Sequence, residues 1–239
     1  MLLSTKAIVI HTFPYSESSL MLKAYTEKIG YTTFLLKGFK RNKKQKINLH
    51  PLALVEITCV VKEKTTLNQA RNISLLKPYS NILTNPIKSG LAMFIAEFLG
   101  HAIRDDQEGE SHFFTWLTQA IDHLENKDSL ANFHLWFLLS LTDHLGFLPQ
   151  GKRSNETPLF NIIEGSFLKE GSSAISCSET ESILLDKLMT NKMDELLLLR
   201  FSKEERKQIL ALLHEYFQVH LDKEFSLKSL DVLSQLYTD

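Results

Sequence analysis

Residues 18–37 read SSLMLKAYTEKIGYTTFLLK, in which apolar and polar side chains alternate on both sides of a short turn at 27–30. Alternation with a period of two is typical of a β-strand that buries one face, and Gly30 favours a turn between two such strands. Similar strand-like segments occur at 6–13, 51–62 and 67–76. Five short strands in about 75 residues predict a small closed barrel of the oligonucleotide-binding (OB) type, with an SH3-like barrel as the alternative.

The periodicity changes from residue 84 onward, where apolar side chains recur with helical spacing. Asn85 can cap a helix that starts at Pro86, and its expected apolar stripe comprises Ile87, Leu91, Phe94, Ile95, Phe98 and Ala102. Further helices are expected at 110–124, 129–145, 179–189, 193–200, 202–221 and 228–237. The segment 149–177 breaks this series and contains a possible hairpin at 159–168. The sequence predicts an α+β chain with a barrel domain at 1–80 and a helical domain at 81–239.

The connection between the third and fourth predicted strands is strongly basic. Six of the ten residues from 37 to 46 are Lys or Arg, and no acidic residue lies among them. Residues 1–80 hold 13 basic and 4 acidic residues, a net charge of +9, whereas residues 81–239 hold 14 and 24, a net charge of −10. Such a concentrated positive surface favours a polyanion as partner. A solvated loop without a ligand is the alternative.

Aromatic side chains near this run could stack on the bases of a single strand. The candidates are Tyr15, Tyr25, Tyr31, Phe34 and Phe39. Alternation places Tyr31 and Phe34 on opposite faces of their strand, so we do not expect both in the core. Phe39 lies inside the basic run and is the expected exposed aromatic. The predicted binding site comprises Lys37, Phe39, Lys40, Arg41, Lys43, Lys44 and Lys46.

The sequence contains no Walker A, GxGxxG, GxSxG or HExxH motif, which argues against a nucleotide-hydrolysing enzyme, a serine hydrolase or a zinc protease. His101, Asp105 and Asp106 have helical spacing and suggest a metal-dependent nuclease as an alternative, but a metal site needs three or four converging ligands. We therefore predict a protein that is not an enzyme. Two isolated cysteines, no signal-peptide pattern and no long apolar stretch predict a cytoplasmic protein without a membrane segment.

Several stretches resemble the RecO family of bacterial recombination mediators in their order and spacing. They are residues 5–10, 15–20, 35–41, 75–79, 131–139, 145–149, 216–221 and 227–233. The resemblance implies a protein that binds single- and double-stranded DNA, anneals complementary strands and, with RecR, helps to load RecA in the RecFOR pathway. It implies RecR, single-strand-binding protein (through its acidic tail) and, indirectly, RecA as partners, and a location at the nucleoid. An RNA-binding or translation-associated module is the alternative.

One region departs from the pattern of this family. Many RecO proteins carry a four-cysteine zinc site between helical segments, but residues 149–177 contain only Cys177. Residues 160–167 resemble the strand pair of that subdomain without its ligands. We therefore expect no structural zinc and no other cofactor, and a small insertion that is held by packing alone.

Overall fold

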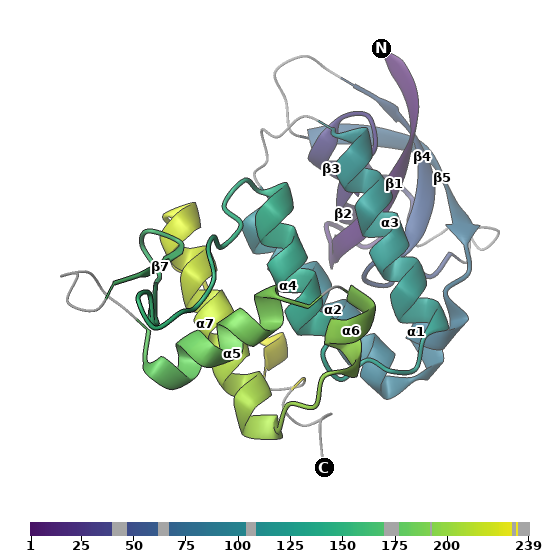
Figure 1. The fold of residues 1–239 in the computed structure, drawn as a ribbon. Helices are drawn as coiled ribbons and strands as arrows, with labels where there is room; N and C mark the ends of the chain where they lie inside the picture. Colours follow the sequence, from purple (N-terminus) through teal and green to yellow (C-terminus); the bar gives the residue numbers. More distant parts are fainter. Residues whose placement is uncertain are drawn as a thin grey trace. The chain divides into compact units, whose positions relative to one another are not determined.

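The structure is a computed structural model that describes residues 1–39, 47–61, 67–103, 109–169, 177–191, 193–230 and 233 (Figure 1). The chain divides into two compact units. One contains residues 1–126 and the segment that begins at residue 227, and the other contains residues 127–226. The predicted domain division at residue 80 stays a prediction.

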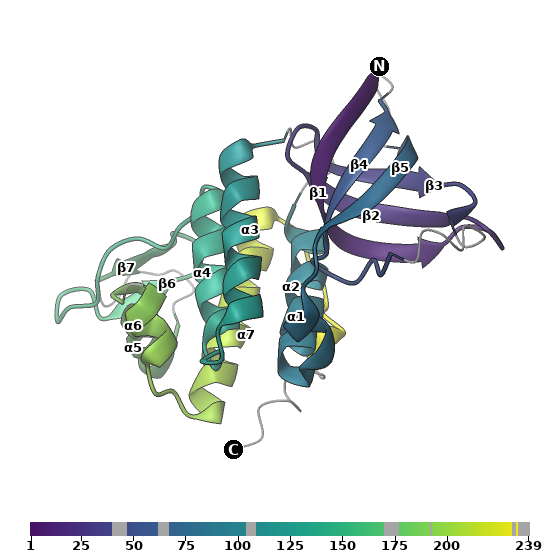
Figure 2. The ribbon, with the colours of Figure 1, turned by 90° about the vertical axis from the view of Figure 1, so that its right-hand side faces the viewer.

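Five strands of the first unit form a closed barrel in the order β1-β2-β3-β5-β4, with β4 pairing back to β1 (Figure 2). They are β1 (Leu2–Pro14), β2 (Leu20–Thr26), β3 (Gly30–Leu36), β4 (Leu54–Val60) and β5 (Leu67–Lys77). The β3–β5 pair is parallel, and the other four pairs of the barrel are antiparallel. The predicted OB-type barrel followed by helices is confirmed.

The barrel interior is filled by side chains that alternate along the strands. Its core comprises Ala7, Val9, Leu22, Ala24, Phe34, Leu36, Ala53, Val55, Ile57, Cys59, Ala70 and Ile73. Because successive residues of a strand point to opposite faces, this set explains the period of two in the sequence. Cys59 belongs to this core as a free thiol, and burial raises its pKa, which makes it a poor nucleophile.

Part of the outer barrel face is also buried, and the expectation for Tyr31 was therefore wrong. Phe34 fills the interior while Tyr31, on the opposite face of β3, is buried as well. Helix α2 (Pro86–Ala102) packs against β1. A Cβ atom on Gly100 of α2 would lie 3.4 Å from Ile10 Cγ2 and 3.7 Å from the Tyr31 hydroxyl. Alternation separates the two faces of a strand, but it does not show that a helix covers the outer one.

Two more helices belong to the first unit, α1 (Ser80–Thr84) and α3 (Ser111–Asn126). The predicted start of α2 is confirmed, since the Asn85 side chain accepts hydrogen bonds from the backbone N–H groups of Ile87 and Lys88. Ile87, expected on the apolar stripe, is instead exposed. Helix α1 was not predicted, because five residues are too few to show a helical period.

A polar network fixes α1 against α3. The buried carboxylate of Glu125 accepts hydrogen bonds of 2.9 Å from the backbone N–H groups of both Asn81 and Ile82. The buried Lys88 ammonium donates to the Glu125 carbonyl oxygen at 2.8 Å. These contacts satisfy backbone groups that a short helix leaves without intrahelical partners. The network shows that α1 depends on a residue more than forty positions away.

The second unit is built from helices and one small hairpin. Its elements are α4 (Phe133–His144), β6 (Leu159–Asn161), β7 (Ser166–Leu168), α5 (Glu179–Met189), α6 (Met193–Leu198) and α7 (Lys203–Leu221). The capping box predicted for α7, Ser202 with Glu205, is confirmed. The predicted helix at 129–145 begins only after Asn132. Most of the predicted helix at 228–237 lies outside the described residues.

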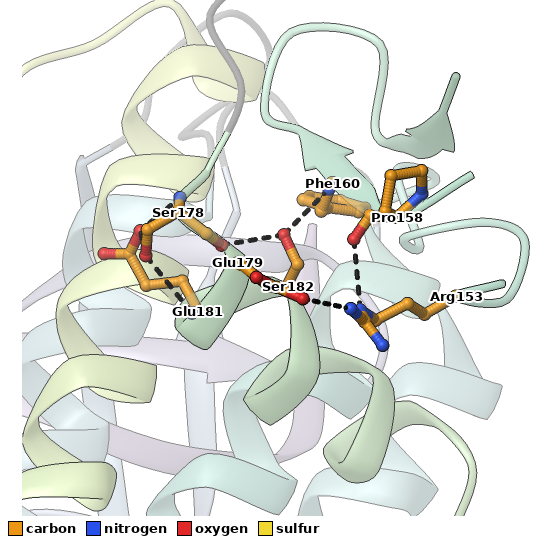
Figure 3. A network of polar contacts seen from close by, with 7 residues as sticks. All are labelled: Arg153, Pro158, Phe160, Ser178, Glu179, Glu181 and Ser182. Atoms are coloured by element: carbon orange, nitrogen blue, oxygen red, sulfur yellow. Dashed lines mark hydrogen bonds and ion pairs between the residues drawn. The ribbon is translucent and has the colours of Figure 1, made fainter. Parts of the chain in front are cut away.

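The β6–β7 hairpin is held by hydrogen bonds as well as by packing, so the expectation of packing alone was wrong (Figure 3). The Arg153 guanidinium contacts a Glu179 carboxylate oxygen at 2.8 Å and donates to the Pro158 carbonyl at 3.1 Å. The Phe160 N–H donates to the Ser182 hydroxyl at 2.9 Å. Within the described ranges, no group of three His, Cys, Asp or Glu side chains could hold a metal ion.

Candidate nucleic-acid interface

The described residues include the start of the predicted basic site. Lys37 follows β3 directly and is exposed, and Gly38 adopts a left-handed backbone with φ of +70°. Glycine favours this conformation because it has no Cβ. Phe39 is the other predicted site residue that the structure describes. The remaining five, Lys40, Arg41, Lys43, Lys44 and Lys46, lie outside the described residues.

A cavity of about 150 Å³ lies where β3 and β5 stop pairing. The parallel ladder joins Thr33 to Leu67, Phe34 to Asn68 and Leu35 to Gln69, and ends there. The cavity is lined by the residues that follow this ladder on either side. They are Leu36, Lys37, Gly38, Phe39, Ala70, Arg71, Asn72 and Ile73. Leu36, Ala70 and Ile73 belong to the barrel core, whereas Lys37, Arg71 and Asn72 are exposed. Three core residues of the barrel therefore line the cavity, and three exposed polar residues form its rim.

Arg71 reaches this rim through a β-bulge that the sequence analysis missed. In the β4–β5 ladder, Thr58 pairs with Asn72 and Cys59 pairs with Ala70, so Arg71 is the extra residue on β5. A bulge interrupts alternation, and Arg71 and Asn72 are consecutive exposed residues between the buried Ala70 and Ile73. Nothing in the sequence around position 71 indicates that parallel pairing places it beside Lys37.

The aromatic candidates are distributed differently from the expectation. Tyr25, Tyr31 and Phe34 are buried. Phe39 is half-buried and packs against the barrel core. Tyr15, in the connection between β1 and β2, is 64% exposed. It is therefore the aromatic of this set that is most open to a stacking base, and a role of Phe39 in binding stays a prediction.

The two cations of the rim differ from two other lysines of the barrel, Lys6 and Lys77. Lys6 lies 3.6 Å from Glu27, and Lys77 lies 2.7 Å from Asp122, as ion pairs. Among the residues that the structure describes, neither Lys37 nor Arg71 forms an ion pair. Their charges are therefore available to an external anion. Salt screens the attraction only in part when the anion lies within a few ångströms.

The alternative metal site cannot be assembled from the described residues. His101 lies in the last turn of α2 and is half-buried, but Asp105 and Asp106 lie outside the described residues. Glu97, one turn before His101, accepts hydrogen bonds from the backbone N–H groups of Lys228 and Ser229. Its carboxylate is therefore engaged in holding the C-terminal segment, and the nuclease alternative stays an untested prediction.

None of the helices that the structure describes combines the length and the apolar character needed to cross a bilayer.

Family models and curated relatives cover almost the whole chain. The model described as Recombination protein O N terminal matches residues 1–79, and the model described as Recombination protein O C terminal matches residues 83–231. A Flavobacterium psychrophilum protein named DNA repair protein RecO is 36% identical, with 100% of both chains covered. Proteins of that name from Christiangramia forsetii and Flavobacterium johnsoniae are 33% and 35% identical, with at least 99% of this chain and 100% of each relative covered.

Proposed function

This chain belongs to the RecO family of DNA repair proteins, and we propose that it binds single- and double-stranded DNA, anneals complementary strands and helps RecR to load RecA. The observation that carries the proposal is the open, basic end of the barrel. Lys37 and Arg71 face solvent there without an ion-pair partner among the described residues, and the basic run of residues 37–46 begins at the same place.

The binding energy would come mainly from phosphate contacts. Each phosphate that a Lys or Arg neutralises releases counterions from the nucleic acid, which gives a sequence-independent affinity that falls as salt rises. The predicted site offers Lys37, Lys40, Arg41, Lys43, Lys44 and Lys46 for this purpose. Phe39 would pack against the barrel end and orient the run, and Tyr15 could add a stacking contact.

Annealing needs no catalytic group, so we propose that this protein is not an enzyme. Two complementary strands repel each other through their phosphates, and a positive surface that contacts both backbones lowers this repulsion. The specificity of the product then comes from base pairing between the strands. The protein contributes local concentration and charge neutralisation.

The second unit is the proposed docking site for partners. Exposed cations on α7 and in the segments next to it include Arg200, Lys203, Lys207 and Lys223, although the chain beyond residue 80 is acidic overall. A local basic face suits an acidic peptide, and we propose that the acidic tail of single-strand-binding protein binds there. RecR is the proposed direct partner and RecA the indirect one, in the cytoplasm at the nucleoid.

The test of this function is fluorescence-anisotropy binding of a labelled single-stranded oligonucleotide across a salt series. We expect tight binding at low salt with a steep negative slope of log affinity against log salt. The triple variant Lys37→Glu, Arg41→Glu, Lys44→Glu should bind weakly and keep its fold. The control is Lys152→Glu, which changes an exposed lysine of the other unit. Equal binding by the parent and the triple variant would exclude the basic run as the site.

The same assay separates DNA from RNA. An unlabelled RNA of the same length and sequence competes for the bound DNA oligonucleotide. A preference for DNA, or equal competition, agrees with a DNA repair role, whereas a strong preference for RNA would support the RNA-binding alternative.

A further inference from the structure

We propose that Arg71 and Lys37 together clamp one phosphodiester group of a bound strand in the cavity between β3 and β5. This inference rests on the proposed function and adds to it a residue, Arg71, that lies outside the basic run. It places a fixed contact point at the edge of the barrel, where the basic run begins in the sequence.

The position of the two side chains follows from the parallel ladder. Leu35 pairs with Gln69 in the last step of that ladder. Lys37 and Arg71 each lie two residues beyond this last pair, where the ladder has ended. Both residues line the cavity of about 150 Å³ that opens where the pairing ends. The two cations therefore border the same opening.

The bulge in β5 is the reason that Arg71 points to solvent. Regular alternation would bury one of two consecutive residues, yet Arg71 and Asn72 are both exposed between two core residues. Bulges re-aim side chains at the rims of barrels and next to binding sites. The bulge thus adds a cation and an amide to the rim and leaves the barrel core intact.

The chemistry of the rim selects a phosphate. The guanidinium of Arg71 can donate two parallel hydrogen bonds to two oxygens of one phosphate. The Lys37 ammonium adds a second positive charge at the same cavity. A Cβ atom on Gly38 would meet no heavy atom within 4 Å, so the backbone there leaves the entrance open. Among the residues that the structure describes, no acidic one lines the cavity.

The test compares Arg71→Ala, Arg71→Lys and the control Lys152→Ala in the anisotropy salt series. We expect Arg71→Ala to weaken single-strand binding roughly tenfold at low salt and to reduce the salt slope by about 0.7, the value for one phosphate contact on a single strand. Arg71→Lys should keep the slope and recover only part of the affinity, because it keeps the charge but loses the planar fork. Lys152→Ala should match the parent.

A double-mutant cycle tests whether the two cations hold the same phosphate. If they do, the double variant Lys37→Ala, Arg71→Ala should lose less affinity than the product of the two single losses, because either change already releases the phosphate. Losses that multiply would mean separate contacts and would overturn the clamp. A thermal-unfolding scan of each variant checks that the fold is kept.

The outcomes distinguish this inference from the proposed function. If the parent binds no oligonucleotide at low salt, both fail. If the parent binds with a steep salt slope but Arg71→Ala behaves like Lys152→Ala, only the clamp is overturned. The last experiment compares the thermal unfolding of the parent and of Arg71→Ala in inorganic phosphate and in chloride at equal ionic strength. Stabilisation by phosphate that is lost in Arg71→Ala, with oligonucleotide affinity unchanged, would assign the cavity to a free anion and overturn the nucleic-acid assignment.

Discussion

The two ends of strand β3 lie in opposite environments. At its start, Tyr31 is buried under Gly100 of α2, and Tyr25 on the neighbouring strand packs edge-on against Phe113 of α3, with ring centroids 4.9 Å apart. At its end, Lys37 is exposed beside an open cavity that it shares with Arg71. We refer to these regions as the covered side and the open end of the barrel.

The difference separates stability from function within one small domain. On the covered side, large side chains on the outer face of the barrel bury apolar area against helices, which contributes folding free energy. At the open end, charged side chains remain in water, where they contribute little to stability but can meet a polyanion. Substitutions on the two sides should therefore affect different measurements.

The largest effect on stability is expected for Tyr25→Ala on the covered side. Tyr25 is buried, contacts Phe113 and Phe114, and its hydroxyl accepts a hydrogen bond of 3.2 Å from the Glu110 N–H. Removing a large buried aromatic side chain typically costs about 3–5 kcal/mol of unfolding free energy. Urea denaturation of the full chain measures it. The control Tyr15→Ala removes an exposed ring and should change stability by less than about 0.5 kcal/mol.

A smaller effect is expected for Gly109→Ala, near the β2–β3 turn. A Cβ atom at this position would lie 2.6 Å from the carbonyl carbon of Lys28 and 2.8 Å from the Glu27 oxygen, both backbone atoms. The segment must shift, at a cost of about 1–3 kcal/mol, as in other overpacked sites. Gly100→Ala is the matched control, because its Cβ would only reach contact distance and alanine favours a helix. Equal losses in the two variants would mean that Gly109 does not contact the turn.

The variant Glu97→Gln tests how far α2 depends on the C-terminal segment. Burial of Glu97 raises its pKa, but hydrogen bonds from Ser229 and from the Lys228 and Ser229 N–H groups outweigh this, so the pKa is lowered. A lowered pKa means stabilisation that is present above about pH 4.3, the ordinary Glu value, and lost as pH falls through the folded value. We expect the unfolding free energy of the parent to exceed that of Glu97→Gln by about 1 kcal/mol at pH 7.

Denaturation at several pH values checks this expectation. The difference between the parent and Glu97→Gln should shrink as the pH falls below about 4. A difference that stays constant down to pH 3 would contradict the assigned role of the Glu97 carboxylate, because the neutral acid would then stabilise the segment as well as the anion does.

The smallest effects on stability are expected at the open end. Lys37→Ala and Arg71→Ala remove exposed cations that form no ion pair among the described residues, so the unfolding free energy should change by less than about 0.5 kcal/mol. Thermal unfolding and oligonucleotide binding are measured on the same samples. A marked loss of stability in either variant would show that the removed cation stabilises the fold, as the side chains of the covered side do.

Much of the secondary structure could be predicted because its signals are local. The strand-like segments that form β1 to β5 and the capping residues Asn85 and Ser202 are marked by patterns within a few positions of the chain, and each was confirmed by the structure. Helix α1 was missed because its first N–H groups are satisfied by Glu125, far along the sequence. The burial of Tyr31 was missed because alternation marks a face but not the helix that covers it.

For the candidate site, too, some features are encoded locally in the sequence and others depend on tertiary contacts. The sequence by itself predicted five short strands followed by helices and the concentration of positive charge after β3, because short-range periodicity and composition encode these features. The family was indicated by the resemblance of short motifs along the chain. Tertiary structure alone decided that Arg71 stands beside Lys37 and that Phe39 rests against the barrel. The physical reason is that a parallel strand pair and a β-bulge bring together residues whose separation in sequence carries no information about their distance in space.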